Sequence, residues 1–176
     1  KEYRRQRQMC IRDRGSVPNH FFVELNFPEF FTAKLGATKV LWEAGELEMT
    51  EIQHIGILVS QRNGCAYCTA AFCTILNHGL GESEDLVSQL LQKGTDSVSN
   101  ARLKHILEYA LKVNDEPAAV TDADIEGLRS VGLTDKGIVQ VTHIVSDFGS
   151  YNRLNLALQT DYDYQDLWQN LAFPKS

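Results

Sequence analysis

The sequence predicts an all-α protein, a compact antiparallel bundle of about seven or eight helices. Three observations lead to this prediction. Apolar residues recur at spacings of three and four along most of the chain, as on one face of a helix. No segment alternates apolar and polar residues between turn residues, as a half-buried strand would. The connections between the expected helices are short, which favours antiparallel neighbours.

Helix boundaries follow from caps and breakers. Pro28 suits the first turn of a helix, and Thr50, Thr121 and Thr134 stand where N-caps are expected. Glycine or Asn-Gly marks most of the ends. The tail, residues 159–176, is aromatic and is expected to dock on a neighbouring surface. The expected helices cover residues 28–35, 37–46, 50–62, 65–78, 84–93, 99–114, 121–132 and 135–158.

Length, composition and charge exclude several classes of protein. The chain of 176 residues can bury a substantial core without metal or disulfide support. Hydrophobic residues make up 43% and charged residues 23%, the balance of a soluble globular protein. No apolar run approaches the roughly 20 residues that a membrane span needs. The net charge of −6 argues against a nucleic-acid-binding surface, which must be basic. We therefore expect neither a membrane nor a nucleic-acid partner.

The first residues differ in charge from the rest of the chain. Residues 1–14 hold six basic and two acidic side chains, a pattern compatible with a nucleic-acid or membrane contact or a targeting peptide. The string RRQRQMCIRDR resembles translated sequencing-adapter sequence, and we favour that interpretation. We expect residues 1–16, with Cys10, to be a non-native or disordered extension, and residues 17–176 to form a single all-α domain.

Three of the four cysteines, Cys65, Cys68 and Cys73, lie within nine residues. Cys65 and Cys68 form a Cys-x-x-Cys pair at the expected start of a helix, where unpaired backbone N–H groups and the helix dipole stabilise a thiolate. The spacing lets one sulfur attack an oxidant or a disulfide and the other resolve the product. Such a pair without a recognisable signal peptide indicates redox or metal chemistry in a reducing compartment. We expect a redox-active dithiol in a cytoplasmic protein.

A zinc site is the alternative for this cluster, because Cys65, Cys68, Cys73 and His78 have a spacing similar to a zinc knuckle. On one helix at about 100° per residue, the four side chains point at about 0°, 300°, 80° and 220°. They cannot converge on one ion from these directions. We therefore expect no metal and no cofactor, and we expect Cys73 to fill apolar space in the core.

Two segments resemble a known family. The segment EIQHIGILVSQRNGCAYCTAAF, residues 51–72, resembles the core of the carboxymuconolactone decarboxylase and alkylhydroperoxidase D superfamily, and VSDFGSYNRL, residues 145–154, resembles the Asn-Arg helix of its peroxidase-related members. The resemblance covers roughly residues 18–165. It implies an alkylhydroperoxidase D-like fold, homo-oligomers, and dithiol-dependent reduction of peroxides. Decarboxylation is not implied, because the decarboxylase members lack the cysteine pair.

Two positions depart from the family pattern. The pattern places a glutamate twelve residues before the first cysteine and a histidine four residues after the second, and these positions here hold Gln53 and Phe72. The family pair relays protons to and from the thiol, whereas neither glutamine nor phenylalanine is a general acid or base. Glu51 and His54 can touch on their helix and are candidates to replace the relay or line the site. A solvated ion pair is the simpler expectation for these two residues.

Together these residues predict a dithiol oxidoreductase of antioxidant type. Cys65 and Cys68 are expected to reduce peroxides or exchange disulfides, with a thiol reductant as the second partner. Loss of a general acid or base typically costs about 10²–10⁴ in rate, so turnover is expected to be slow. The alternative is a non-catalytic member of the same fold that senses redox state or binds a ligand or partner.

Overall fold

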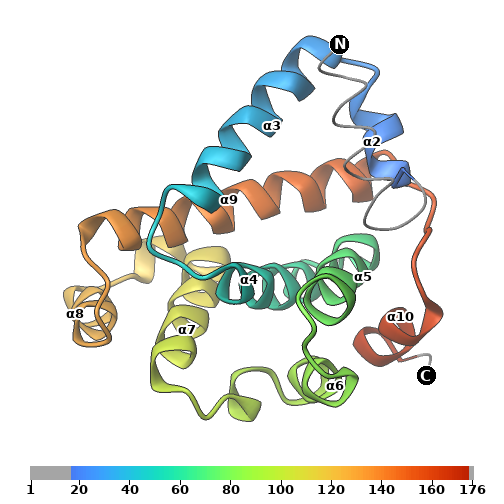
Figure 1. Ribbon diagram of the computed structural model, residues 1–176. Helices are drawn as coiled ribbons and strands as arrows, with labels where there is room; N and C mark the ends of the chain where they lie inside the picture. Colours follow the sequence, from blue (N-terminus) through green and yellow to red (C-terminus); the bar gives the residue numbers. More distant parts are fainter. Residues whose placement is uncertain (1–16, 175–176) are drawn as a thin grey trace.

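The computed structural model describes residues 17–174, and the expected extension at residues 1–16 lies outside this range. Within it, nine α-helices are joined by turns, and no strand is present (Figure 1). The all-α prediction is therefore confirmed. The helices are α2 (Asn19–Glu24), α3 (Pro28–Glu43), α4 (Met49–Arg62), α5 (Ala66–Thr74), α6 (Glu84–Lys93), α7 (Ala101–Asp115), α8 (Asp122–Ser130), α9 (Asp135–Ala157) and α10 (Asp166–Ala172).

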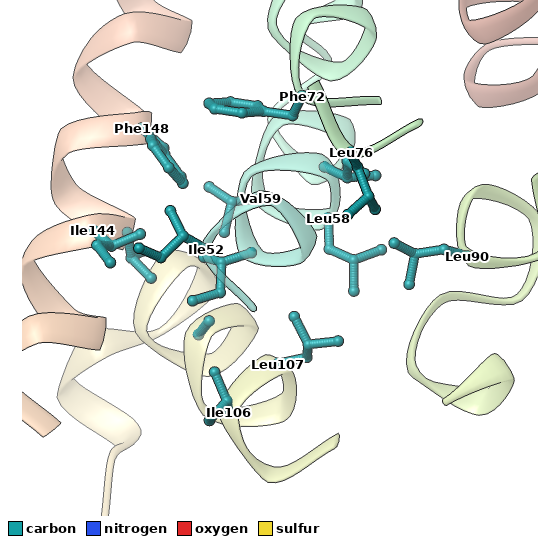
Figure 2. Close-up of a cluster of buried hydrophobic side chains, with 14 of the residues drawn as sticks. Ile52, Leu58, Val59, Phe72, Leu76, Leu90, Ile106, Leu107, Ile144 and Phe148 are labelled. Atoms are coloured by element: carbon teal, nitrogen blue, oxygen red, sulfur yellow. The ribbon is translucent and has the colours of Figure 1, made fainter. Parts of the chain in front are cut away.

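Helix α4 lies at the centre of the molecule and contacts α5, α7 and α9 (Figure 1). Its residues 51–60 are all buried, so this helix is covered on every side rather than along one stripe. Figure 2 shows how the core forms around it: Ile52 and Val59 of α4 lie between Ile106 of α7 and the α9 residues Ile144 and Phe148. A helix held in this way gives the segment that follows it a fixed starting point.

Helix α3 diverges from the body of the molecule and meets α9 along only part of its length (Figure 1). It is one helix of 16 residues, so the expected break between residues 35 and 37 is wrong. A glycine inside a helix costs only about 1 kcal/mol relative to alanine, and this cost is too small for Gly36 to end the helix. Residues on both sides of Gly36 bond to α9: Lys34 to the Ser150 hydroxyl at 3.4 Å and Thr38 to the Asp147 carboxylate at 3.0 Å.

The expected caps are confirmed at α8 and α9 and corrected at α4. Thr121 and Asp124 form a capping box at the start of α8, and the Thr134 side chain accepts a hydrogen bond from Lys136 at the start of α9. Helix α4 begins earlier than expected, because Glu48 rather than Thr50 is its N-cap.

The last elements close the core around the cysteine segment. The helix that follows Cys65 does not run as one α-helix to residue 78: it changes to a π-helical turn at Ile75–Gly79. The tail forms α10, which contacts α5 and α6, and Trp168 at its centre is fully buried. The expected docking of the tail therefore occurs within the chain itself. None of the described helices has both the length and the apolar character needed to cross a bilayer.

Candidate functional site

The two cysteines of the pair lie at the junction between α4 and α5. The turn at Asn63-Gly64 ends α4, and Gly64 has a φ of 72°, a conformation that favours glycine. The Cys65 N–H then donates to the Ser60 carbonyl at 2.9 Å, which places Cys65 as the N-cap of α5. The Cys68 N–H donates to the Cys65 sulfur at 3.4 Å. The expected position of the pair at a helix start is thus the observed one.

Cys68 is the cysteine of the pair whose surroundings favour the thiolate. Both thiols are free and buried, with 1% of Cys65 and 4% of Cys68 exposed. The pKa of Cys68 is lowered chiefly by a hydrogen bond from Cys65, against the opposing effect of burial, and is lowered further by Asn152, Asn155 and the Lys34 charge. The pKa of Cys65 is raised by that same hydrogen bond and by burial. Once the pair has lost one proton, the remaining proton therefore resides on Cys65.

Asparagines of α9 hold this junction. The Asn155 amide donates from Nδ2 to the Cys68 sulfur at 3.2 Å. Asn152 donates to the Ser60 hydroxyl at 2.9 Å and accepts from the Asn63 amide at 2.8 Å. These bonds tie α9 to the end of α4 and to the turn before Cys65. The Asn-Arg helix of the sequence resemblance contains Asn152, but the contact of Asn155 with the dithiol was not predicted.

A histidine from α2 contacts the amide that bonds to Cys68. His20 of α2 is buried, and its Nδ1 lies 3.1 Å from Oδ1 of Asn155. Its backbone N–H donates at 3.0 Å to the hydroxyl of Tyr67, one of the two residues between the cysteines. Burial lowers the pKa of His20 below its usual value, although Asn155 and Glu24 oppose this. The sequence offered no signal for His20, because it lies 45 residues before Cys65 and in no motif.

Gln53 and Phe72 occupy the relay positions and provide no relay. Gln53 is fully buried; its amide nitrogen lies 3.5 Å from the Met49 sulfur, and its Oε1 has no hydrogen-bond partner in the described part of the chain. The Phe72 ring packs on Phe148 with centroids 4.4 Å apart, at one end of the core cluster (Figure 2). Where the family pattern has an acid and a base, this chain has an amide and an apolar contact.

Glu51 and His54 do not form the expected solvated pair. Both are buried. Glu51 accepts a hydrogen bond from Arg102 Nε at 2.8 Å and another from the Glu48 N–H at 2.9 Å. Nδ1 of His54 lies 2.7 Å from the Thr50 carbonyl, and burial lowers the pKa of this histidine. The expectation fails because α4 is covered on every side, and both side chains have structural partners of their own.

Cys73 and His78, the other two residues considered for zinc, have surroundings of their own. Cys73 is fully buried, and burial raises its pKa. His78 lies in the π-helical turn, and its Nε2 lies 3.4 Å from the amide nitrogen of Gln165. Among residues 17–174, no group of three or more histidine, cysteine, aspartate or glutamate side chains could hold a metal ion.

Comparisons with known proteins agree with this architecture. No protein-family model and no curated protein matches the chain. Among solved structures, it is similar to an uncharacterized peroxidase-related protein with an alkylhydroperoxidase AhpD core from Ralstonia eutropha JMP134, with a TM-score of 0.83 and 26% identity over 99% of this chain and 91% of that one. An uncharacterized peroxidase-related protein from Silicibacter sp. TM1040 matches with a TM-score of 0.83 and 25% identity over 96% and 87% of the two chains.

A third neighbour shares the fold alone. The debrominase Bmp8 matches with a TM-score of 0.74 and 18% identity over 92% of this chain and 87% of its own. Together, the nine helices, the paired cysteines and these neighbours confirm the resemblance expected from the sequence. The chain has the fold of the alkylhydroperoxidase D-like, peroxidase-related proteins, within the carboxymuconolactone decarboxylase and alkylhydroperoxidase D superfamily.

Proposed function

We propose that the protein is a dithiol oxidoreductase of antioxidant type that reduces peroxides or exchanges disulfides. Cys68 is the attacking thiolate and Cys65 is the resolving thiol. The observation that carries this proposal is the sulfur of Cys68, which accepts hydrogen bonds from Cys65 and from Asn155. Hydrogen bonds to the charged form stabilise a thiolate inside a protein, and the thiolate is the nucleophile.

The proposed reaction has two steps on the protein. The Cys68 thiolate attacks one peroxide oxygen, so that an S–O bond forms and the O–O bond breaks; the leaving alkoxide or hydroxide takes up a proton and departs as alcohol or water. The Cys65 thiol then attacks the sulfenic acid on Cys68. An S–S bond forms, the S–O bond breaks, and water leaves. A thiol reductant restores both thiols by disulfide exchange.

Gln53 and Phe72 limit the rate of this reaction, because neither can deliver the proton that the leaving oxygen needs. Without that general acid, turnover is expected to fall by about 10²–10⁴ relative to a site that has one. Disulfide exchange needs less proton transfer, since its leaving group is itself a thiolate. Because Gln53 and Phe72 cannot transfer protons, they also favour a second candidate function, that of a non-catalytic redox sensor or a protein that binds a ligand or partner.

Single cysteine variants test the proposal. Peroxide consumption with dithiothreitol as reductant should be lost in Cys68→Ser. With peroxide alone and no added thiol, Cys65→Ser should consume one equivalent and accumulate a sulfenic acid that dimedone labels. Cys73→Ala is the matched control, because Cys73 is equally buried but lies outside the pair. Unchanged consumption in Cys68→Ser would refute the proposal. Reversible disulfide formation without turnover in the wild type would instead identify the sensor.

We also propose that the chain forms a homo-oligomer. Several large apolar side chains of the α2–α3 arm are exposed, and α3 contacts the rest of the chain mainly through α9. Burial of these side chains against a second copy would remove apolar area from water. Sedimentation velocity should detect a species larger than 19.8 kDa, and a monomer at all concentrations would refute this part. The exposed residues are Phe22, Phe27, Phe30 and Val40.

A further inference from the structure

Both ends of the Asn155 side-chain amide, the nitrogen and the oxygen, have hydrogen-bond partners. Its nitrogen donates to the Tyr151 carbonyl at 3.0 Å and to the Cys68 sulfur at 3.2 Å. A backbone carbonyl can only accept, so the contact with Tyr151 identifies the nitrogen end of the amide. The oxygen end must then face His20, whose Nδ1 is 3.1 Å away.

This orientation fixes the protonation of His20. Because Oδ1 of Asn155 can only accept, Nδ1 of His20 carries the proton and donates it. The other ring nitrogen, Nε2, lies 3.7 Å from Glu24, and Glu24 in turn bonds to Lys34 at 3.1 Å. When Nε2 is also protonated, the ring is a cation held between Asn155 and Glu24, without any change in the bond to Asn155.

We propose that His20 is a positioning residue that acts on Cys68 through Asn155. The hydrogen bond from His20 strengthens the N–H···S bond from Asn155 to the Cys68 thiolate. The reactivity of Cys68 therefore depends on the protonation of His20. A hydrogen bond to the amide oxygen polarises the amide, and its N–H becomes a stronger donor. A positively charged ring polarises it further. This contribution comes from α2 and α9 and not from the positions of Gln53 and Phe72. The inference rests on the proposed role of Cys68 as the attacking thiol.

The direction of the pH dependence follows from the charges around the ring. Burial lowers the pKa of His20, Glu24 and Asp163 act to raise it, and Lys34 acts to lower it. The rings of Tyr67 and Tyr151 also face His20. Below the pKa of His20 the ring is charged and the Cys68 thiolate is favoured. As the pH rises through that pKa, which lies below the usual value of about 6.5, the ring becomes neutral and the pKa of Cys68 rises.

Rates of alkylation by iodoacetamide, assigned to Cys68 by tandem mass spectrometry, measure this effect on the intact chain. The wild type should show a step in thiolate reactivity below about pH 6.5 in addition to the titration of the thiol itself. His20→Leu removes donor and charge, and should slow alkylation of Cys68 at about pH 7 by roughly threefold to tenfold. His20→Asn keeps a donor near Nδ1 but cannot titrate. It should stay within about twofold of the wild type at that pH while losing the step at low pH.

His105 supplies the control, because it is a histidine on another helix whose Nδ1 lies 2.8 Å from the backbone carbonyl of Ala101 and not from an amide that contacts the dithiol. His105→Asn should leave both the rate and the low-pH step unchanged. The inference is overturned if folded His20→Leu alkylates at the wild-type rate, or if the step persists in His20→Asn. If His20→Leu does not fold, the step in His20→Asn decides alone. Because alkylation needs no peroxide, a protein that passes this test but consumes none would contradict only the peroxidase proposal.

Discussion

Phe72 stands at the position where the family pattern has a histidine that relays protons to the dithiol. The Phe72 ring contacts Phe148, and among residues 17–174 the buried carbonyl of the Gln53 side chain has no hydrogen-bond partner. A buried acceptor without a donor is a cost to folding that packing elsewhere must offset. A hydrogen-bond donor introduced at position 72 could bond to an acceptor at position 53. Substitution of both residues by the acid and base of the family pattern should therefore restore proton transfer.

The double variant Gln53→Glu, Phe72→His should therefore raise peroxide turnover by about 10-fold to 100-fold, as an acid–base pair returns to the site. It should also lose about 1–3 kcal/mol of stability, because the contact with Phe148 is weakened. Steady-state peroxide reduction and thermal unfolding measure the two effects. Phe72→Leu is the control for altered packing without a base. Equal activity in the two variants would show that proton delivery does not limit the rate.

Between helices, α4 and α5 approach each other closely at Gly56. A Cβ built on Gly56 of α4 would lie 2.6 Å from the Phe72 ring of α5, whereas one built on Gly36 of α3 would meet nothing within 4 Å. The absence of a side chain at Gly56 therefore leaves room for the Phe72 ring of α5, the helix that carries Cys68.

Gly56→Ala should accordingly destabilise the protein by about 1–3 kcal/mol, because the added methyl group forces the Phe72 ring to move in a close-packed core. The matched control Gly36→Ala should be neutral or should stabilise by up to about 1 kcal/mol, since alanine is the better helix former. Urea unfolding measures both. Similar effects of the two substitutions would contradict the close approach of α4 and α5.

The start of α8 depends on one ionised carboxylate. Asp124 accepts hydrogen bonds from Lys112 at 2.6 Å and from the Thr121 N–H at 2.7 Å, and the Lys112 contact is the largest cause that lowers its pKa to about 2. A depressed pKa contributes stability above the unfolded value of about 3.9, and this contribution is lost as the pH falls from there towards about 2.

Wild type and Asp124→Asn should therefore differ most in free energy of unfolding above about pH 5, and the difference should shrink as the pH falls towards about 2. Urea unfolding at a series of pH values measures it. Glu108→Gln, an exposed carboxylate change on α7, is the control and should show no such trend. A difference that stays constant with pH would mean that the carboxylate charge plays no part.

At the scale of the whole molecule, α10 packs against α5, the helix that carries Cys68. Helix α10 contacts both α5 and α6, and its Trp168 is fully buried. Trp168→Ala should cost about 3–5 kcal/mol through the cavity it leaves. Leu156→Ala, at a side chain that is 48% exposed, should cost less than about 1 kcal/mol. Calorimetry measures both changes, and a small effect of Trp168→Ala would show that α10 is not part of the cooperative core.

The cysteine pair, most helix ranges and the caps at α8 and α9 could be predicted from the sequence, because they depend on residues only a few positions apart. The predictions failed where distant packing decides. Helix α3 continues through Gly36 because it bonds to α9 on both sides. Glu51 and His54 are buried because α4 lies between α5, α7 and α9.

By itself, the sequence determined an all-α chain with a dithiol at a helix start and with Gln53 and Phe72 in place of the family relay. Local spacing and residue chemistry suffice for the fold class and the dithiol, whereas the relay positions follow from the resemblance to the family. Only the tertiary structure decided which sulfur is the better thiolate, because this depends on Asn155 from α9 and His20 from α2, residues that lie 87 and 45 positions from the pair. Hydrogen bonds act at about 3 Å, and only folding brings these residues to that distance from Cys68 or from one another.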